Sequence, residues 1–255
     1  MSAVERERRG HVEILTINRP EARNAINGDV TAAMSAALDE LATDDDCWVV
    51  VLTGAGDKAF SAGMDLKAFA TGQGAGIIDA NGFAGITRRS FPKPIIAAVN
   101  GSALAGGCEI MLSCDLVVAA DHAQFGIPEV KRGLIAGAGG LIRLPNRLPR
   151  AVALELALTG DPISPERALQ LGLINRVVPA DRLMEETLAL ADLIAGNAPL
   201  AVRLSKKVML GSADLSEDEA WAFNDSTFSE VFTSADAMEG AVAFAEKRPP
   251  NWQGK

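Results

Sequence analysis

The sequence predicts an α/β fold followed by a helical tail. Short runs of β-branched and apolar residues alternate with segments of helical spacing up to residue 197, and the remaining residues read as helix throughout. The chain has 255 residues, of which 48% are hydrophobic and 22% charged, so it can bury a full core without disulfides. We therefore expect residues 1–197 to form an α/β core and residues 198–255 to form a separate helical region.

The expected elements follow one another in the order that an α/β fold requires. Residues 12–17 are rich in β-branched side chains and end at a turn, and the next apolar residues keep helical spacing. Expected strands are 12–17, 48–53, 95–99 and 116–119, and expected helices are 30–41, 151–158, 165–171 and 183–195.

Two segments have less regular patterns. Residues 71–82 are glycine-rich and almost uncharged, which predicts a surface loop, with a lid over a ligand as the alternative. In the tail, an apolar helical face is expected to pack on the core or on a neighbouring subunit; it comprises Met238, Ala241, Val242 and Ala245.

Charge and composition exclude several classes of partner. The chain has 24 basic and 33 acidic residues, a net charge of −9, and no basic run, which argues against nucleic acid and anionic membrane surfaces. The apolar stretch 94–120 is interrupted by Asn100, Glu109 and Asp115 before it reaches a membrane-spanning length. Three cysteines without metal-type spacing, and an N-terminus without an apolar segment, predict a cytoplasmic protein.

The residue inventory limits the chemistry further. Only His11 and His122 are present, and no G-x-S-x-G sequence supplies a nucleophile for a triad. Zinc motifs and both glycine-rich nucleotide motifs are also missing. Carboxylates remain for proton transfer, and backbone N–H groups remain for stabilising negative charge.

The segment 97–115 carries the strongest signal. A strand ends at Asn100, and a helix is expected to begin near Gly106, which would aim the N–H of Gly106 at a developing oxyanion. Glu109 then falls in the first helical turn among small and apolar residues, where burial would raise its pKa toward the range of a general base or acid. Alternatively, Glu109 only complements the helix dipole.

A second carboxylate, Glu129, follows Pro128. The helix 107–113 carries the chain away by about 10 Å at ~1.5 Å per residue. A strand over 115–120 returns it by about 20 Å at ~3.3 Å per residue. The spacing therefore permits Glu109 and Glu129 to share a pocket, although a solvated acid at a loop end is the alternative for Glu129.

A third element spans residues 58–67. Gly63 allows a tight turn before a short helix, and the N–H of Met64 would then be a second oxyanion donor. A loop-to-helix transition explains this pattern equally well.

Together these segments resemble the crotonase superfamily, the enoyl-CoA hydratase/isomerase family. The matching segments are 18–20, 23–25, 62–67, 105–115, 125–129, 137–140, 158–160 and 172–175. The resemblance implies a spiral of ββα units, with a C-terminal helical region that builds trimers, often paired as hexamers. It also implies an acyl-CoA thioester substrate and no metal or redox cofactor.

The resemblance assigns roles to individual residues. The N–H groups of Met64 and Gly106 would hold the thioester carbonyl, while Ala62, Asp65, Leu66 and Lys67 would lie along the CoA moiety. Glu109 and Glu129 match the two glutamates of hydratases. The implied reaction is reversible syn addition of water to a 2-trans-enoyl-CoA, giving a 3-hydroxyacyl-CoA, as in fatty acid β-oxidation.

Other members of the family leave alternatives open, namely an enoyl-CoA isomerase, a specialised acyl-CoA dehydratase and a non-catalytic acyl-CoA-binding protein. Three departures from the usual pattern bear on the substrate. Ala105 replaces the first of three glycines, Met64 is larger than the usual residue, and Ile127 stands where a glutamine is common. We expect the last two changes to reshape the acyl pocket.

Overall fold

A six-stranded sheet forms the centre of the structure, a computed structural model that describes residues 2–72 and 76–255. Its strand order is β1-β2-β3-β7-β9-β11, with β1 antiparallel to β2 and every other neighbouring pair parallel. The strands are β1 Val4–Arg9, β2 Val12–Ile17, β3 Val49–Gly54, β4 Ala59–Ser61, β5 Ile78–Asp79, β6 Gly82–Phe83, β7 Ile95–Val99, β8 Ser102–Leu104, β9 Leu116–Ala120, β10 Gln124–Gly126 and β11 Arg176–Val178.

Helices cover both faces of this sheet and extend from its end. The α-helices are α1 Gly28–Thr43, α2 Leu66–Ala70, α3 Gly106–Leu112, α4 Gly140–Arg147, α5 Arg150–Thr159, α6 Pro165–Gln170, α7 Leu183–Ala195, α8 Pro199–Gly211, α9 Glu217–Phe232 and α10 Ala235–Glu246. Short 3₁₀ helices are η1 Pro20–Ala22, η2 Pro128–Arg132 and η3 Ala180–Arg182.

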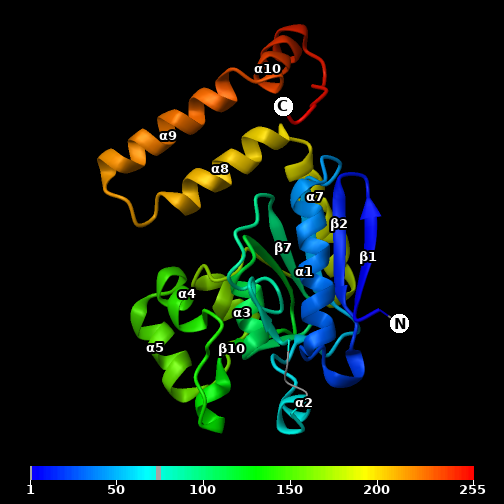
Figure 1. Cartoon of the computed structure of the whole chain (residues 1–255), viewed down its shortest axis with the longest axis vertical. Helices are drawn as coiled ribbons and strands as arrows, with labels where there is room; N and C mark the ends of the chain where they lie inside the picture. Colours follow the sequence, from blue (N-terminus) through cyan, green and yellow to red (C-terminus); the bar gives the residue numbers. More distant parts are fainter. Residues whose placement is uncertain (1, 73–75) are drawn as a thin grey trace.

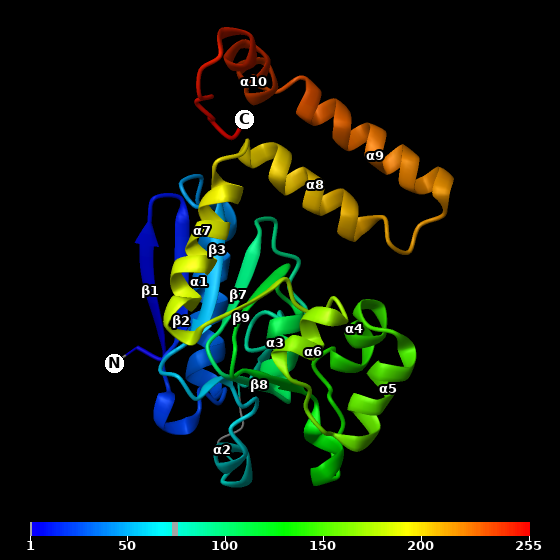
Figure 2. The ribbon, with the colours of Figure 1, turned by 180° about the vertical axis from the view of Figure 1, so that it is seen from behind.

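The alternation of side chains along the parallel strands divides the core into two layers. Val49 and Val51 of β3 pack in one cluster with Leu183 of α7. Val50, between them in sequence, belongs to the opposite cluster with Met34 of α1. Figure 1 shows α1 in front of the sheet, and Figure 2, turned by 180°, shows α7 in front. Because both faces are buried, these strands read as continuous apolar runs.

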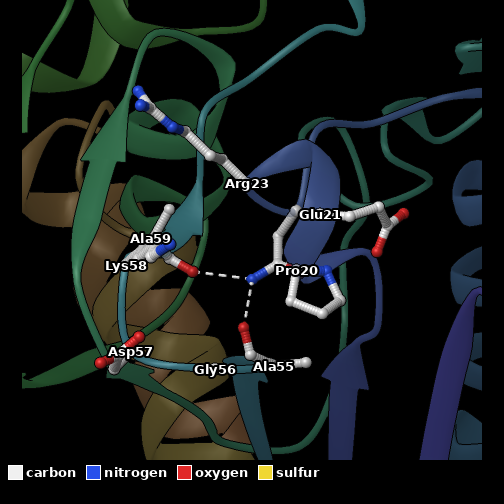
Figure 3. A pocket seen from close by; sticks show the side chains of 9 residues that line it. Pro20, Glu21, Arg23, Ala55, Gly56, Asp57, Lys58 and Ala59 are labelled. Carbon is white, nitrogen blue, oxygen red and sulfur yellow. Dashed lines mark hydrogen bonds between the residues drawn. The ribbon is translucent and has the colours of Figure 1, made fainter.

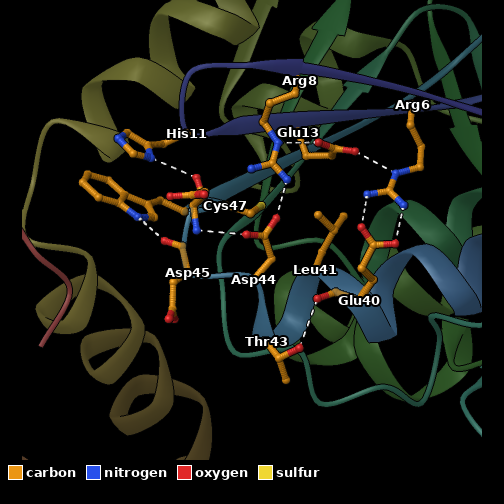
Figure 4. A network of polar contacts seen from close by, with 12 residues as sticks. Arg6, Arg8, His11, Glu13, Glu40, Leu41, Thr43, Asp44, Asp45 and Cys47 are labelled. Carbon is orange, nitrogen blue, oxygen red and sulfur yellow. Dashed lines mark hydrogen bonds and ion pairs between the residues drawn. The ribbon is translucent and has the colours of Figure 1, made fainter.

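The structure confirms the expected strands β2, β3, β7 and β9 and the expected helices α1, α3, α5, α6 and α7, with small shifts such as Trp48 preceding β3. It adds β1, which the sequence did not reveal because most of its residues are charged and exposed. Arg6 and Arg8 of β1 both pair with the buried Glu13 of β2, and Arg8 also pairs with Asp44 (Figure 4). β1 is an edge strand of the sheet, and its arginine side chains anchor it through these ion pairs.

A smaller parallel sheet, β10-β8-β4, adjoins the main one and carries the functional segments. β8 leads directly into α3, and β10 leads into η2. Each strand has three residues, too few for a reliable sequence pattern. This sheet brings the start of α3 and the residues after β10 to the same region.

The expected surface loop over 71–82 contains an ordered element instead. Ile78 and Asp79 pair with Phe83 and Gly82 in a two-stranded antiparallel hairpin, β5–β6, and both Ile77 and Phe83 are buried. Residues 73–75 of that expected loop lie outside the described residues. The apolar side chains on either side of the hairpin anchor it to the core.

The tail is helical, as expected, and α8, α9 and α10 extend away from the sheets (Figure 1). The apolar face expected to pack on the core or on a neighbouring subunit does not pack on the core of this chain, because Met238, Ala241, Val242 and Ala245 are all exposed. Packing on a neighbouring subunit stays a prediction. α10 instead buries Ala243, and its Asp236 accepts hydrogen bonds from the N–H groups of residues 253 and 254. The division into two domains stays a prediction.

None of the described helices is, by itself, long and apolar enough to cross a membrane. One bent pair, 180–195 with 199–211, reaches that length and apolar content only when its two helices, 100° apart, are counted together.

Candidate active site

The N-terminus of α3 begins at a strained residue. Ala105 has φ 53° and ψ −130°, a conformation that favours glycine, and its N–H donates to the carbonyl of Gly126 at 3.0 Å. Gly106 follows as the first residue of α3, and its N–H donates to no acceptor within the described residues. The expected helix start near Gly106 is confirmed, and the substitution of alanine for glycine at position 105 places a methyl group on the strained residue.

Glu109 lies in the first turn of α3 and is only 3% exposed. Its Oε1 accepts hydrogen bonds from the N–H groups of Ala138 at 2.7 Å and Gly140 at 2.8 Å. Burial raises the pKa of Glu109, against the opposing effects of these two N–H groups and of the Arg143 charge. The carboxylate is therefore held in one orientation by the backbone that leads into α4.

Glu129 lies on η2, directly after β10. Its Oε2 is buried and has no hydrogen-bond partner among the described residues. Burial raises the pKa of Glu129, and the negative charge of Glu109 raises it further. The charge of Glu109 therefore acts on Glu129, and a pocket shared by the two carboxylates stays a prediction.

The segment around Met64 lies against the start of α3. Met64 forms an isolated parallel bridge with Ile26, in which the flanking Gly63 carbonyl and Asp65 N–H make the hydrogen bonds. The N–H of Met64 donates to none of the described residues. A Cβ placed on Gly63, which has φ 85°, would stand 2.7 Å from the nitrogen of Gly106. The two candidate oxyanion donors thus lie on closely packed backbone segments.

The other residues expected along CoA differ in their surroundings. Asp65 caps α2 through the N–H of Ala68, pairs with Arg19 at 2.9 Å, and has a pKa that both groups hold below its usual range. The Asp65 carboxylate therefore holds the start of α2 in place and links it to Arg19. Leu66 and Lys67 are exposed on α2, whereas Ala62 donates its N–H to the carbonyl of Arg23.

Sequence reasoning missed Phe83. Its ring packs against Gly106 so closely that a Cβ on Gly106 would stand 2.6 Å from the ring. Phe83 follows directly after the glycine-rich, almost uncharged segment 71–82. The signal in the sequence was a single aromatic residue at the end of this glycine-rich segment.

A cavity of about 330 Å³ opens beside the Met64 segment, between η1 and the residues that follow β3. Figure 3 shows Arg23 and Lys58 on its wall, together with the acidic Glu21 and Asp57. Asn24 closes the floor by donating to the carbonyls of Ala55 and Ala59. The carbonyl of Arg23 accepts a hydrogen bond from the N–H of Ala62, which connects this wall of the cavity to the expected CoA segment.

A second cavity, of about 420 Å³, is mainly apolar and lies between α4 and α5. Ile127 and Leu141 are among the residues that line it. Ile127 lies two residues before Glu129, and Leu141 directly follows Gly140, whose N–H donates to Glu109.

Among the described residues, no histidine or cysteine side chain makes a hydrogen bond to Glu109 or Glu129. His11 stacks on Trp48, and Nε2 of His122 contacts the carbonyl of Asp57. Cys47, Cys108 and Cys114 are buried free thiols. Within residues 2–72 and 76–255, no group of three or more His, Cys, Asp or Glu side chains is arranged to hold a metal ion.

Comparisons with known proteins cover nearly the whole chain. The sequence model of the enoyl-CoA hydratase/isomerase family matches residues 7–255. The carnitinyl-CoA dehydratase of Proteus mirabilis is 40% identical over 253 residues, 97% of each chain. Among solved structures, an enoyl-CoA hydratase from Mycobacterium tuberculosis is 48% identical with a TM-score of 0.96, and a carnitinyl-CoA hydratase from Mycobacterium avium is 50% identical with a TM-score of 0.80; both matches span each chain completely.

These matches confirm the resemblance inferred from the sequence and the predicted crotonase-like α/β fold. The carboxylate pair, the two unpaired N–H groups and the adjoining cavities all lie within the matched residues. The chain belongs to the enoyl-CoA hydratase/isomerase family, the crotonase superfamily.

Proposed function

We propose that the protein is an enoyl-CoA hydratase, which adds water reversibly to a 2-trans-enoyl-CoA and gives a 3-hydroxyacyl-CoA. The observation that carries the proposal combines two features: the buried Glu109 with the half-buried Glu129, and the N–H groups of Met64 and Gly106, which donate to no acceptor among the described residues. Isomerases of the family keep one or neither glutamate, so the pair favours hydration.

The surroundings of the two glutamates favour different protonation states. Glu109 accepts two backbone N–H bonds, which stabilise its ionised form. Oε2 of Glu129 is buried and has no partner among the described residues. Burial and the charge of Glu109 favour the protonated form of Glu129, against its one backbone hydrogen bond and the charge of Arg132. Glu109 is therefore the base that receives a proton from water, and Glu129 is the acid.

In the hydration direction, the oxygen of water bonds to C3 of the enoyl group as Glu109 takes the proton of that water. The electrons of the C2=C3 bond move toward the thioester, and Glu129 gives its proton to C2 on the same face. Glu109 then gives up the proton that it gained, and Glu129 takes up one proton. This restores the starting protonation of both carboxylates. No other reactant is needed.

Negative charge develops on the thioester oxygen during this addition. The N–H groups of Met64 and Gly106 are the donors for it, and a preorganised donor of this kind contributes about 2.7–4 kcal/mol to the transition state. Since Met64 acts through its backbone, its large side chain is compatible with this role.

The proposal places the CoA moiety along Ala62, Met64, Asp65, Leu66 and Lys67. Arg23 and Lys58 in the adjoining cavity supply positive charge for its phosphates, which the net charge of −9 would otherwise repel. Asp65 acts here through its cap and its pair with Arg19.

The test is hydration of a panel of 2-trans-enoyl-CoA thioesters by the wild type and by Glu109→Gln and Glu129→Gln. We expect each substitution to lower kcat by about 10²–10⁴-fold, the usual contribution of general acid–base catalysis. Glu155→Gln, at an exposed position of α5, is the matched control and keeps wild-type turnover. Tight binding of thioesters with no turnover would instead identify a non-catalytic acyl-CoA-binding member.

A second candidate is a dehydratase or hydratase for carnitinyl-CoA, favoured by the names of the relatives at 40% and 50% identity. Its chemistry is the same addition, run on an acyl group that carries a quaternary ammonium. Aromatic side chains bind such cations, and Phe83 packs at Gly106. Including carnitinyl-CoA and a neutral 3-hydroxyacyl-CoA in the panel separates the two, since kcat/KM identifies the preferred acyl group.

A further inference from the structure

The guanidinium of Arg143, on α4, joins two backbone segments that hold the site. Its Nη2 donates to the carbonyl of Thr87 at 2.6 Å, and its Nη1 donates to the carbonyl of Ala138 at 3.4 Å. Thr87 and Ala138 are far apart in sequence. The segment of Ala138 contacts Glu109, and the segment of Thr87 contacts Phe83, which packs against Gly106.

One end of the link is the support of Glu109. Ala138, whose carbonyl accepts from Arg143, also donates its N–H to Oε1 of Glu109. The next residue, Gly139, has φ 110°, and a Cβ there would stand 2.2 Å from Nη1 of Arg143. The guanidinium is therefore packed directly on the backbone that orients the carboxylate.

The other end of the link is the segment that carries Phe83. The hydroxyl of the buried Thr87 accepts a hydrogen bond from the N–H of Phe83 at 2.9 Å. The Phe83 ring in turn packs against Gly106, one of the proposed oxyanion donors. Arg143 thus connects the base and the wall of the oxyanion hole through a single side chain.

The charge of Arg143 also acts on the base. It lowers the pKa of Glu109, in opposition to burial, while burial lowers the pKa of Arg143 itself. The other ionisable groups around Glu109 are Glu129 on η2 and the neighbouring Cys108, whose thiol has its pKa raised to about 12 by burial. Arg143 is thus the positive group that favours ionised Glu109.

We propose that Arg143 is a positioning residue, which fixes the 137–140 backbone against the Phe83 segment and thereby orients Glu109 for proton transfer. This inference rests on the proposed hydratase function. Arg143 touches neither substrate nor reacting atoms in this role. Its effect passes through Ala138 and Thr87.

The first experiment compares Arg143→Gln, Arg143→Lys and Arg147→Gln in enoyl-CoA hydration. Arg147 lies one turn further along α4 and donates to the carbonyl of Cys114. Arg147→Gln is therefore the matched control, because it also removes an arginine–carbonyl hydrogen bond but not one to the backbone that holds Glu109. We expect Arg143→Gln to lower kcat by about 10-fold or more, the scale of small misplacements of catalytic groups. KM should change less than kcat, because the interaction serves the transition state. The kcat of Arg143→Lys should lie between those of the wild type and Arg143→Gln, since one ammonium cannot bridge the carbonyls of Thr87 and Ala138.

The second experiment needs no turnover. Carbon-13 NMR titration of the Glu109 carboxyl in the unliganded protein reports its pKa in each variant. Arg143→Gln should raise that pKa, whereas Arg143→Lys, which keeps the charge, and Arg147→Gln should leave it near the wild-type value.

Unchanged kcat and unchanged Glu109 pKa in folded Arg143→Gln would overturn the inference, as would equal effects of Arg147→Gln. If Arg143→Gln does not fold, Arg143→Lys decides, because wild-type kcat in that variant contradicts a bridging role. A wild type that hydrates no thioester in the panel would refute the hydratase proposal, while the NMR titration would still test the link between Arg143 and Glu109.

Discussion

The two glutamates differ in what their oxygens contact. Oε1 of Glu109 accepts from two N–H groups of residues 138 and 140, whereas Oε2 of Glu129 is buried and has no hydrogen-bond partner in the part of the chain that the structure describes. An unpaired buried carboxylate oxygen is costly to ionise, which suits an acid but lowers the stability of the fold.

This arrangement predicts a pH-dependent stability gain for Glu129→Gln. Burial raises the folded-state pKa of Glu129 above its usual 4.5. As the pH rises past 4.5, the carboxyl ionises more readily in the unfolded chain, so the wild type loses stability until the folded-state pKa is passed. Glutamine lacks this penalty, and we expect a gain of about 1 kcal/mol at neutral pH.

Thermal unfolding of Glu129→Gln and wild type across this pH range measures that gain. The difference in Tm should grow with pH. A difference that shrinks as the pH rises would contradict the assigned burial of an ionisable Glu129.

Single residues were predictable from the sequence where local pattern determined their role. Glu109 and Gly106 lie in one helix start, and Met64 follows a glycine turn, so short motifs located them. Arg143 and Phe83 act through contacts with residues distant in the chain. No local pattern encodes such contacts, and both residues required the structure.

At the scale of elements, the start of α3 depends on two adjacent glycines with different neighbours. A Cβ on Gly106 would meet the Phe83 ring at 2.6 Å, whereas a Cβ on Gly107 would meet the backbone oxygen of Ser61 at 2.0 Å. A side chain can move to relieve a contact, but the backbone of β4 cannot do so without disturbing the small sheet.

This difference predicts separate outcomes for two alanine substitutions. Gly106→Ala should cost about 1–3 kcal/mol and reduce turnover, because it displaces the Phe83 ring. Adding Phe83→Leu should restore part of the stability of Gly106→Ala but none of that of Gly107→Ala. Urea unfolding of the single and double variants measures both effects, and equal rescue of the two glycine variants would contradict the contacts described.

Elements were predictable when burial gave them a pattern. β2, β3, β7 and β9 are buried almost throughout, so their apolar runs identified them. β4, β8 and β10 have three residues each, and β1 is an exposed edge anchored by arginine pairs. Their positions depend on neighbouring strands, which a single sequence does not display.

At the scale of the whole molecule, the tail leaves large apolar side chains in solvent. Met238 is 68% exposed and Phe244 is 87% exposed on α10, and Trp221 and Phe232 of α9 are exposed as well. The sequence identified an apolar face here but could not distinguish packing on the core from packing on another subunit. Exposed patches of this kind favour association between chains.

We therefore propose that α8–α10 assemble the protein into trimers or hexamers. Sedimentation equilibrium of the wild type should give three or six chains per particle. The double substitution Met238→Asp with Phe244→Asp should shift the protein toward monomers, because charge in the contact is costly to desolvate. Circular dichroism controls for loss of helix, and a monomeric wild type would contradict the proposal.

The proposed mechanism requires Glu109 and Glu129 to act as one unit on a single water and a single double bond. Its most direct test is kcat/KM for hydration of a four-carbon 2-trans-enoyl-CoA by the wild type, Glu109→Gln, Glu129→Gln and the double variant. If the two carboxylates form one unit, each single substitution abolishes most of the activity. The kcat/KM of the double variant then equals that of the less active single variant. Wild-type hydration in either single variant, or losses that multiply in the double variant, would contradict it.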